Sequence, residues 1–333
     1  MSEYLVDIQH ERLSFFTPAG EVKALNDVSI RLAEGEVLGI VGESGSGKSV
    51  TAYSLMGLTA YPGKLIGGTL DFNGHRINDM TEKDFRKMRG NEVSIIFQDP
   101  MTSLNPVYTV GNQIEEVILL HTGKNKAEAH ERARELLTLV GINEPDRRLK
   151  QYPHELSGGM RQRVMIAIAL ACEPKLLIAD EPTTALDVTI QAQILELMME
   201  LKEKLGMAII MITHDLGIVA SMCDRIAVMY AGHIVEYGST DDIFYNPHHE
   251  YTKGLLNSIP KMHEAEYVRL VPIEGTPVDM LNPPAGCPFA PRCKACMKIC
   301  LREMPPVTEL SDVHYTQCWI NQKENVAGGA SDE

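Results

Sequence analysis

Short apolar runs recur along the chain and predict strands that are buried on both faces. They carry no alternation of apolar and polar residues, which is typical of parallel strands covered by helices on either side. Helical periodicity follows several of them, for example over Val188 to Leu205. An α/β fold with a parallel sheet is therefore expected, and its predicted strands are Val37–Val41, Ser94–Gln98, Leu176–Glu181 and Ala208–Thr213.

Two other segments break this rhythm. Residues 4–40 alternate short apolar runs with turn residues, which predicts antiparallel strands lying beside the Val37–Val41 strand. Val110 to His121 and Lys126 to Val140 have helical periodicity and mixed charge, with no strand between them. The pattern predicts an α/β core that carries an antiparallel β subdomain and a helical insert.

A glycine-rich turn between the first buried strand and a predicted helix from Val50 has the spacing of a phosphate-binding loop. Its glycines allow backbone N–H groups to point inward at phosphate oxygens, and the helix adds the positive end of its dipole. Lys48 would contact the β- and γ-phosphates and Ser49 would bind Mg²⁺. The loop is Gly42, Glu43, Ser44, Gly45, Ser46, Gly47, Lys48 and Ser49.

Polar residues follow three of the other buried strands, at the edge where parallel sheets bind ligands. Gln98 ends one strand, Asp180 and Glu181 end the next, and His214 follows the last. Asp180 is placed to hold Mg²⁺ and Glu181 to activate water, while His214 could touch a γ-phosphate. The alternative, two acids at a solvated turn, is weak because the preceding strand is wholly apolar.

Two further features allow a structural or a functional interpretation. Ser157, followed by Gly158 and Gly159, is either an ordinary capped helix start or a second helix N-terminus suited to phosphate. Phe15 and Phe16 are adjacent on a predicted strand, so one can face the core while the other stacks on a purine ring.

Composition narrows the partners and the compartment. The formal net charge of −14 over 333 residues argues against nonspecific binding of nucleic acid, which needs a basic surface. No apolar run is long enough to cross a bilayer, and the N-terminus has no signal-peptide pattern, so a cytosolic protein is expected. Five of the seven cysteines crowd into the last part of the chain, which in a reducing compartment suggests metal before disulfide.

Taken together, residues 4–245 resemble the ATP-binding subunit of an ABC transporter. Five motifs stand in the order of that family: the phosphate loop, a Q-loop glutamine, an LSGG signature, an Asp-Glu pair and a switch histidine. The resemblance implies a P-loop NTPase core, with ATP and Mg²⁺ as cofactors. It also implies a head-to-tail pair in which the signature of one subunit closes on the ATP of the other.

The resemblance assigns roles by position. Glu181 would be the general base, His214 would hold the γ-phosphate and water, and Gln98 would contact Mg²⁺ and couple to the membrane subunit. Phe15 would stack on adenine, with Phe16 the second choice, and Val50 would complete the ATP-binding set. Mg²⁺ would be held by Ser49, Gln98 and Asp180, the partner's ATP by Ser157, Gly158 and Gly159, and the D-loop aspartate would be Asp187.

Asp99–Pro106, Asn246–Leu256 and Gly286–Cys293 resemble the oligopeptide and dipeptide importer branch. This implies an ATP-hydrolysing motor at the cytoplasmic face of the bacterial inner membrane. Its expected partners are a second ABC ATPase, two permease subunits and a periplasmic or extracellular solute-binding protein. A nickel or other small-solute importer shares these motifs. A soluble ABC ATPase acting on nucleic acid or ribosomes is a different class, disfavoured by the single phosphate loop and the missing coiled-coil insertion.

The cysteine-rich segment has few residues able to build a hydrophobic core, so a stable fold needs a cross-link such as a bound metal. Four thiolates could hold Zn²⁺ or a [4Fe–4S] cluster, and spacing alone does not decide between them. The importer resemblance implies a [4Fe–4S] cluster on Cys287, Cys293, Cys300 and Cys318, with Cys296 left as a spare thiol.

The expected organisation follows from these assignments. The nucleotide-binding core occupies 1–97 and 164–245, and the helical subdomain with Q-loop and signature occupies 98–163. A C-terminal extension with the cysteine cluster covers 246–320, and 321–333 form a disordered tail.

Overall fold

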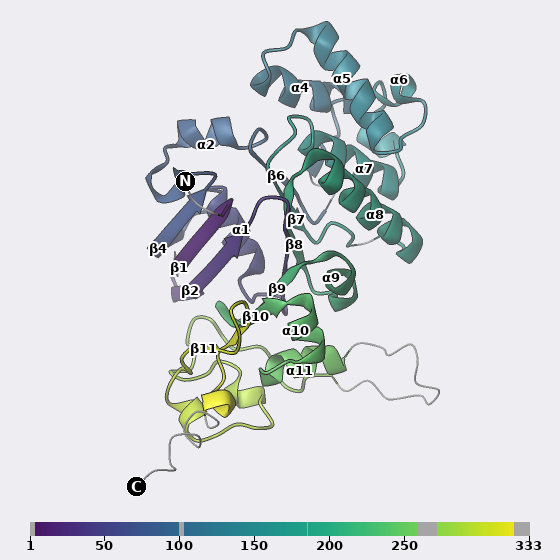
Figure 1. The fold of residues 1–333 in the computed structure, drawn as a ribbon. Coiled ribbons are helices and arrows are strands. Elements are labelled where there is room, and N and C mark those ends of the chain that lie inside the picture. The colour runs from purple at the N-terminus through teal and green to yellow at the C-terminus, as the bar shows by residue number, and fades with distance from the viewer. Residues whose placement is uncertain (1–3, 100–102, 185, 259–271, 323–333) are drawn as a thin grey trace, which may run out of the picture. The chain divides into compact units, whose positions relative to one another are not determined.

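The structure is a computed structural model that describes residues 4–99, 103–184, 186–258 and 272–322. It contains two compact units that interleave along the sequence. The first unit comprises Met1–Arg31, Leu38–Asn78 and Thr213–Glu333, and the second comprises Leu32–Val37 and Asp79–Ile212. Figure 1 shows the elements of both, and each unit is described by itself.

An antiparallel sheet opens the first unit, with its strands in the order β2-β1-β4-β5. Its strands are β1 (Val6–Thr17), β2 (Gly20–Leu32), β4 (Gly63–Phe72) and β5 (His75–Arg76). The pairing of β1 with β4 runs from Val6 opposite Phe72 to Phe15 opposite Gly63. The expectation that these strands flank the Val37–Val41 strand is therefore wrong. They form a sheet of their own, in which β1 lies between β2 and β4, a strand that follows the phosphate loop in the sequence.

The other strands of the first unit belong to a second sheet, in the order β11-β12-β10-β9-β3. β3 (Val37–Val41) is parallel to β9 (Arg225–Tyr230), which forms an antiparallel hairpin with β10 (His233–Ser239). Two short strands of the C-terminal extension, β12 (Tyr315–Thr316) and β11 (Thr308–Glu309), continue the sheet beyond β10. The helices and 3-10 turns are α1 (Lys48–Leu55), η1 (Ile77–Asp79), α9 (Leu216–Met222), α10 (Thr240–Tyr245), α11 (Glu250–Asn257), η3 (Ala290–Arg292) and η4 (Ile299–Leu301).

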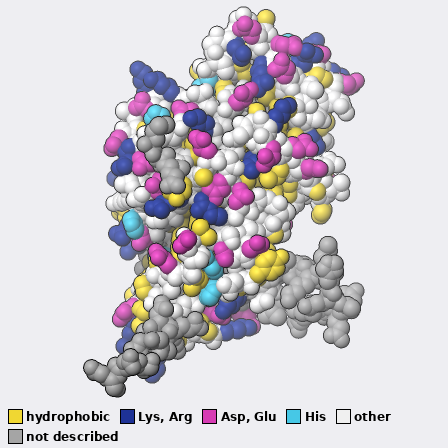
Figure 2. Space-filling model, viewed as in Figure 1, with side chains coloured by type: hydrophobic (Ala, Val, Ile, Leu, Met, Phe, Trp, Pro, Cys, Tyr) yellow, Lys and Arg dark blue, Asp and Glu magenta, His cyan; other side chains and the backbone are white. Residues whose placement is uncertain are grey.

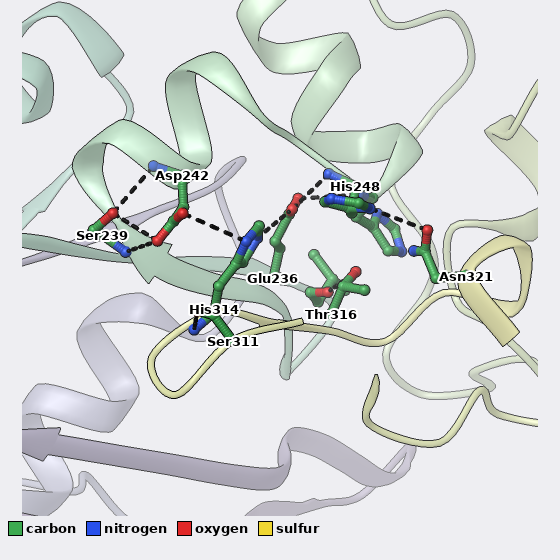
Figure 3. Close-up of polar contacts among 10 residues, drawn as sticks. Glu236, Ser239, Asp242, His248, Ser311, His314, Thr316 and Asn321 are labelled. Atoms are coloured by element: carbon green, nitrogen blue, oxygen red, sulfur yellow. Dashed lines mark hydrogen bonds and ion pairs between the residues drawn. The ribbon is translucent and has the colours of Figure 1, made fainter. Parts of the chain in front are cut away.

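A buried carboxylate joins this sheet to the extension. Glu236 on β10 has an exposed fraction of 0%, and it accepts hydrogen bonds from the backbone N–H groups of His248 and His249 at 2.6 and 3.0 Å. The imidazole of His314, from the extension, lies 3.1 Å from the same carboxylate (Figure 3). Burial alone would raise the pKa of Glu236, but these hydrogen bonds outweigh it and lower the pKa. Glu236 is therefore an ionised anchor for the extension.

Replacing Glu236 by alanine is expected to lower the free energy of unfolding by about 3 kcal/mol or more, because buried N–H groups lose their acceptor. Urea denaturation monitored by fluorescence would measure the change. Glu309→Ala is the matched control, since Glu309 is an exposed glutamate on β11. A loss below about 1 kcal/mol for Glu236→Ala would show that the anchor is dispensable.

The second unit combines three parallel strands with helices. The strand order is β8-β7-β6, and all residues of β7 and β8 are buried, as the apolar runs predict. The helical insert is also present: α4 covers the predicted range, and α5 ends one residue before the predicted end. The elements are α2 (Glu82–Met88), β6 (Val93–Ile96), α4 (Val110–His121), α5 (Lys126–Leu139), α6 (Pro145–Arg148), η2 (Pro153–Glu155), α7 (Gly158–Ala169), β7 (Leu176–Asp180), α8 (Val188–Leu205) and β8 (Ala208–Thr213).

Two details complete the fold. Among the residues described, none of the helices combines the length and the apolar character that a membrane span requires. Of the predicted tail, Asn321 and Gln322 make hydrogen bonds to His248 and Thr308, and residues 323–333 lie outside the described part of the chain.

Candidate functional site

The phosphate loop lies between β3 and α1 in the first unit, and its shape requires glycine at two positions. Gly42 has φ of 152° and a Cβ there would lie 2.2 Å from the carbonyl oxygen of Met229. Gly47 has φ of 106° and a Cβ there would lie 2.9 Å from the carbonyl oxygen of Ala24. Both conformations are closed to residues with side chains, so the loop packs tightly against its own unit.

Lys48 turns its ammonium group back into this loop. The side chain is largely buried, and Nζ donates to the carbonyl oxygens of Gly42 at 2.7 Å and Glu43 at 3.0 Å. The loop is also fixed from the β9–β10 turn, where the N–H of Gly232 donates to the carbonyl of Ser46 at 2.9 Å. The charge, the helix start at Lys48 and the curled backbone therefore face one place, as a phosphate cradle requires.

In the second unit, the predicted base and the Q-loop residue are in contact. Gln98 Nε2 donates to Glu181 Oε2 at 2.8 Å, and the hydroxyl of Thr184 donates to the same oxygen at 2.9 Å. Asp180 is buried at the end of β7, and Glu181 follows it with φ of 47°. One oxygen of Glu181 therefore accepts hydrogen bonds from both Gln98 and Thr184.

The signature motif begins α7 in the same unit. Ser157 caps the helix by accepting the N–H of Met160 at 3.3 Å, as its position predicts. A Cβ on Gly159 would lie 2.8 Å from Cγ2 of Ile190, so this glycine lets α7 approach α8 closely. Asp187 caps α8 and accepts the N–H of Ile190 at 2.9 Å. Signature and D-loop residues thus meet at Ile190, while Ala185 of the D-loop lies outside the described residues.

The aromatic candidates and the histidine belong to the first unit. Phe16 is the more accessible of the two phenylalanines, with 46% exposed, and the ammonium of Lys64 lies 5.9 Å from its ring centroid. Phe15 is half-buried, and a Cβ on Gly63 would lie 2.8 Å from its ring. His214 is exposed at the end of β8. Phe15 is therefore the inner ring and Phe16 the outer one, because adjacent residues of a strand point to opposite faces.

The cysteines of the extension also separate into two kinds. Cys287, Cys293, Cys300 and Cys318 line the same small cavity, whereas Cys296 is exposed. Burial raises the pKa of Cys287 to about 12 and that of Cys293 to about 11. Among the described residues, no three His, Cys, Asp or Glu side chains are placed to hold a metal ion. The predicted metal or cluster therefore has no support from ligand geometry, although the four thiols share one cavity.

Sequence reasoning missed a contact between the extension and the phosphate loop. Arg292 pairs with Glu43, and the Tyr251 hydroxyl accepts the N–H of Glu43 at 2.8 Å. Glu43 and Arg292 are 249 positions apart, so no local pattern signals the pair.

Comparison with known proteins agrees with the geometry. The chain is 53% identical to the oligopeptide transport ATP-binding protein OppD of Salmonella typhimurium, over 95% of this chain and 93% of the relative. The chain belongs to the ABC transporter family. Its residues 25–184 match the model of the ABC transporter family, and residues 235–300 match that of the oligopeptide/dipeptide transporter C-terminal region.

A second relative and a solved structure extend this assignment. The dipeptide transport ATP-binding protein DppD of Bacillus subtilis is 51% identical over 96% of both chains. The dimeric post-hydrolysis state of an ATP-binding cassette, bound to ADP and phosphate, superposes with a TM-score of 0.64. It is 29% identical and covers 71% of this chain and 98% of the other. This ABC protein is thus an ATP-hydrolysing subunit in the oligopeptide/dipeptide branch, for which ATP and Mg²⁺ are the expected cofactors.

Proposed function

We propose that this chain is the ATP-hydrolysing motor subunit of an importer for di- and oligopeptides. The observation that carries the proposal is similarity over nearly the whole chain to peptide transport ATP-binding proteins, including the C-terminal region that names the branch. The net charge of −14 disfavours a function in nucleic-acid binding, which needs a basic surface. In Figure 2, basic and acidic side chains are interspersed over the visible face of the described residues.

Reconstitution tests the function. The chain would be purified with the permeases and second ATPase that assemble with it, and placed in proteoliposomes with a solute-binding protein. ATP-dependent uptake of a radiolabelled dipeptide is the expected result, and the Lys48→Ala complex is the control. Uptake of nickel in place of peptides would transfer the chain to the small-solute branch. Recovery of ribosomes or nucleic acid without permeases would overturn the importer function.

The proposed chemistry divides the work among the residues described above. Lys48 and the loop N–H groups bind the phosphates, and Ser49 and Asp180 hold Mg²⁺ with Gln98. Glu181 accepts the proton of the attacking water and His214 contacts the γ-phosphate. Adenine stacks on Phe15 or, given its exposed ring, on Phe16. Ser157, Gly158 and Gly159 of each subunit serve the ATP of its partner, with Asp187 nearby.

The permeases are proposed to dock on the segment from Gln98 to Val110, at the cytoplasmic face of the inner membrane. Val107 is 72% exposed and Tyr108 52% exposed, whereas Leu104 on the same loop is buried. Residues 100–102 lie outside the described part of the chain. Two large exposed apolar side chains on one loop support a contact surface.

Cysteine cross-linking tests this docking surface. In a Cys296→Ser background, which removes the exposed native thiol, Val107→Cys and Tyr108→Cys are expected to form adducts with a permease. Leu120→Cys is the matched control, because Leu120 is 74% exposed on α4. Adducts formed equally by all three variants, or by none, would count against docking at this segment.

The extension is proposed to hold a [4Fe–4S] cluster on Cys287, Cys293, Cys300 and Cys318. The support is that these four thiols line one cavity and that Cys296 does not. The four thiolates would supply one ligand for each iron of the cluster. When bound, it would cross-link three separate stretches of the extension.

Cysteine substitution distinguishes cluster, zinc and free thiols. Protein purified without oxygen is expected to be brown, with iron and sulfide in equal amounts. Cys300→Ser should lose most of the iron, whereas Cys296→Ser, the matched control, should retain it. Colourless anaerobic protein with stoichiometric zinc would rule out the cluster. Iron loss in Cys296→Ser alone would show that the wrong fourth ligand is assigned.

A further inference from the structure

The side chain of Arg292, in the extension, contacts the phosphate loop at Glu43. Arg292, at the end of η3, donates from Nη1 to Glu43 Oε2 at 2.5 Å and from Nη2 to Glu43 Oε1 at 3.0 Å. The arginine side chain is 4% exposed and the glutamate 29%. A two-pronged pair of this kind fixes both groups in position and direction.

Contacts other than the ion pair also hold the guanidinium group of Arg292 in place. Nε donates to the carbonyl oxygen of Glu274 at 3.0 Å, and Nη2 donates to that of Ile273 at 3.2 Å. The group also lies over the rings of Tyr230 and Phe289, at 5.8 and 6.0 Å from their centroids. Little freedom is left for Arg292 to lose when Glu43 binds, so the ion pair is preorganised.

A second residue of the extension, Tyr251 on α11, contacts the backbone of Glu43. The buried hydroxyl of Tyr251 accepts the N–H of Glu43, and its ring packs 4.7 Å from that of Tyr230. Glu43, the second residue of the loop, is therefore held through its backbone N–H by Tyr251 and through its carboxylate by Arg292. Lys48 in turn donates to the carbonyl of Glu43, so the residue that Arg292 holds is in direct contact with the phosphate-binding lysine.

A carboxylate in a loop that binds a triphosphate weakens the binding, because both groups are negatively charged. Like charges repel over several ångströms when water is partly excluded, and ATP carries more negative charge than ADP. An arginine paired to that carboxylate offsets its charge and fixes the position of its oxygens. The repulsion requires only that the loop binds ATP, as the family assignment implies, and it is the same whichever solute is transported.

We propose that Arg292 is a positioning residue for ATP: through Glu43, the C-terminal extension neutralises and shapes the phosphate loop. Arg292 offsets the negative charge of Glu43, and it also fixes the conformation of the loop around that residue. It makes the extension part of the nucleotide site, in addition to any cluster that the extension carries.

Titration of nucleotides into variants of the full chain tests this role. Arg292→Ala is expected to raise the Kd for Mg-ATP about tenfold and the Kd for Mg-ADP about threefold, because the larger charge suffers more repulsion. The double variant Arg292→Ala with Glu43→Gln is expected to return the Kd for Mg-ATP to within about threefold of the unsubstituted chain. Arg302→Ala, an exposed arginine of the same extension, is the matched control and should bind both nucleotides normally.

Rescue by Glu43→Gln separates charge from folding. A merely structural arginine would give the same loss in the single and double variants, and that result would overturn the proposal. Unchanged ATP affinity in Arg292→Ala would overturn it as well. If that variant does not fold, Arg292→Gln replaces it, since an amide can still donate to the carbonyls of Ile273 and Glu274. The outcome does not depend on peptide uptake, so this test and that of the proposed function fail independently.

Discussion

Replacing Glu181 by glutamine is expected to lower the turnover of ATP by about 10²–10⁴-fold while leaving the Kd for ATP within about threefold. Gln98 and Thr184 both donate hydrogen bonds to the same carboxylate oxygen of Glu181. A glutamine with its carbonyl at that place keeps both hydrogen bonds. The variant therefore retains the geometry and loses only the ability to accept a proton from water.

Steady-state phosphate release and nucleotide titration measure the two quantities separately. The closed dimer is also expected to accumulate with bound ATP, which gel filtration would detect. Glu203→Gln is the matched control, because Glu203 is an exposed glutamate of α8 in the same unit. Near-normal turnover by Glu181→Gln would remove Glu181 from its proposed role.

Loss of the Lys48 side chain should act on binding, with an expected rise in the Kd for ATP of about 100-fold or more. The ammonium is the charge that we propose to be directed at the phosphates. It also ties the carbonyls of Gly42 and Glu43 together, so its removal loosens the loop as well as weakening the field. Turnover at saturating ATP is a secondary readout, since this residue acts first through affinity.

Equilibrium titration with a fluorescent ATP analogue would measure the loss in Lys48→Ala. Lys204→Ala is the control for removal of a lysine, because Lys204 is exposed near the end of α8. An affinity for ATP close to that of the unsubstituted chain would contradict the assignment of Lys48.

Much of the fold follows from periodicity. The range predicted for α4 is the range observed, because an amphipathic helix has a long and regular signal. β7 and β8 are likewise apolar throughout and wholly buried. The separate antiparallel sheet was not predictable in this way. Short apolar runs separated by turn residues predict strands in the region of β1 and β2, but they do not say which strand each one pairs with.

Side-chain placement in loops was harder to foresee. Leu104, Val107 and Tyr108 share one loop, yet only the first is buried, and nothing in the local sequence distinguishes it. The contact between Gln98 and Glu181 follows from their places just beyond the ends of the neighbouring parallel strands β6 and β7, whereas that between Glu43 and Arg292 has no such basis. The latter depends on where the extension folds back, which no motif encodes.

The long separation of that ion pair has a consequence for synthesis. A ribosome adding about 5–20 residues per second needs about 10 to 50 s to travel from Glu43 to Arg292. Over that interval the nascent chain has a complete phosphate-loop sequence, but the arginine that cancels the Glu43 charge has not yet been made. On this proposal, the full affinity of the loop for ATP is reached only when translation is nearly finished.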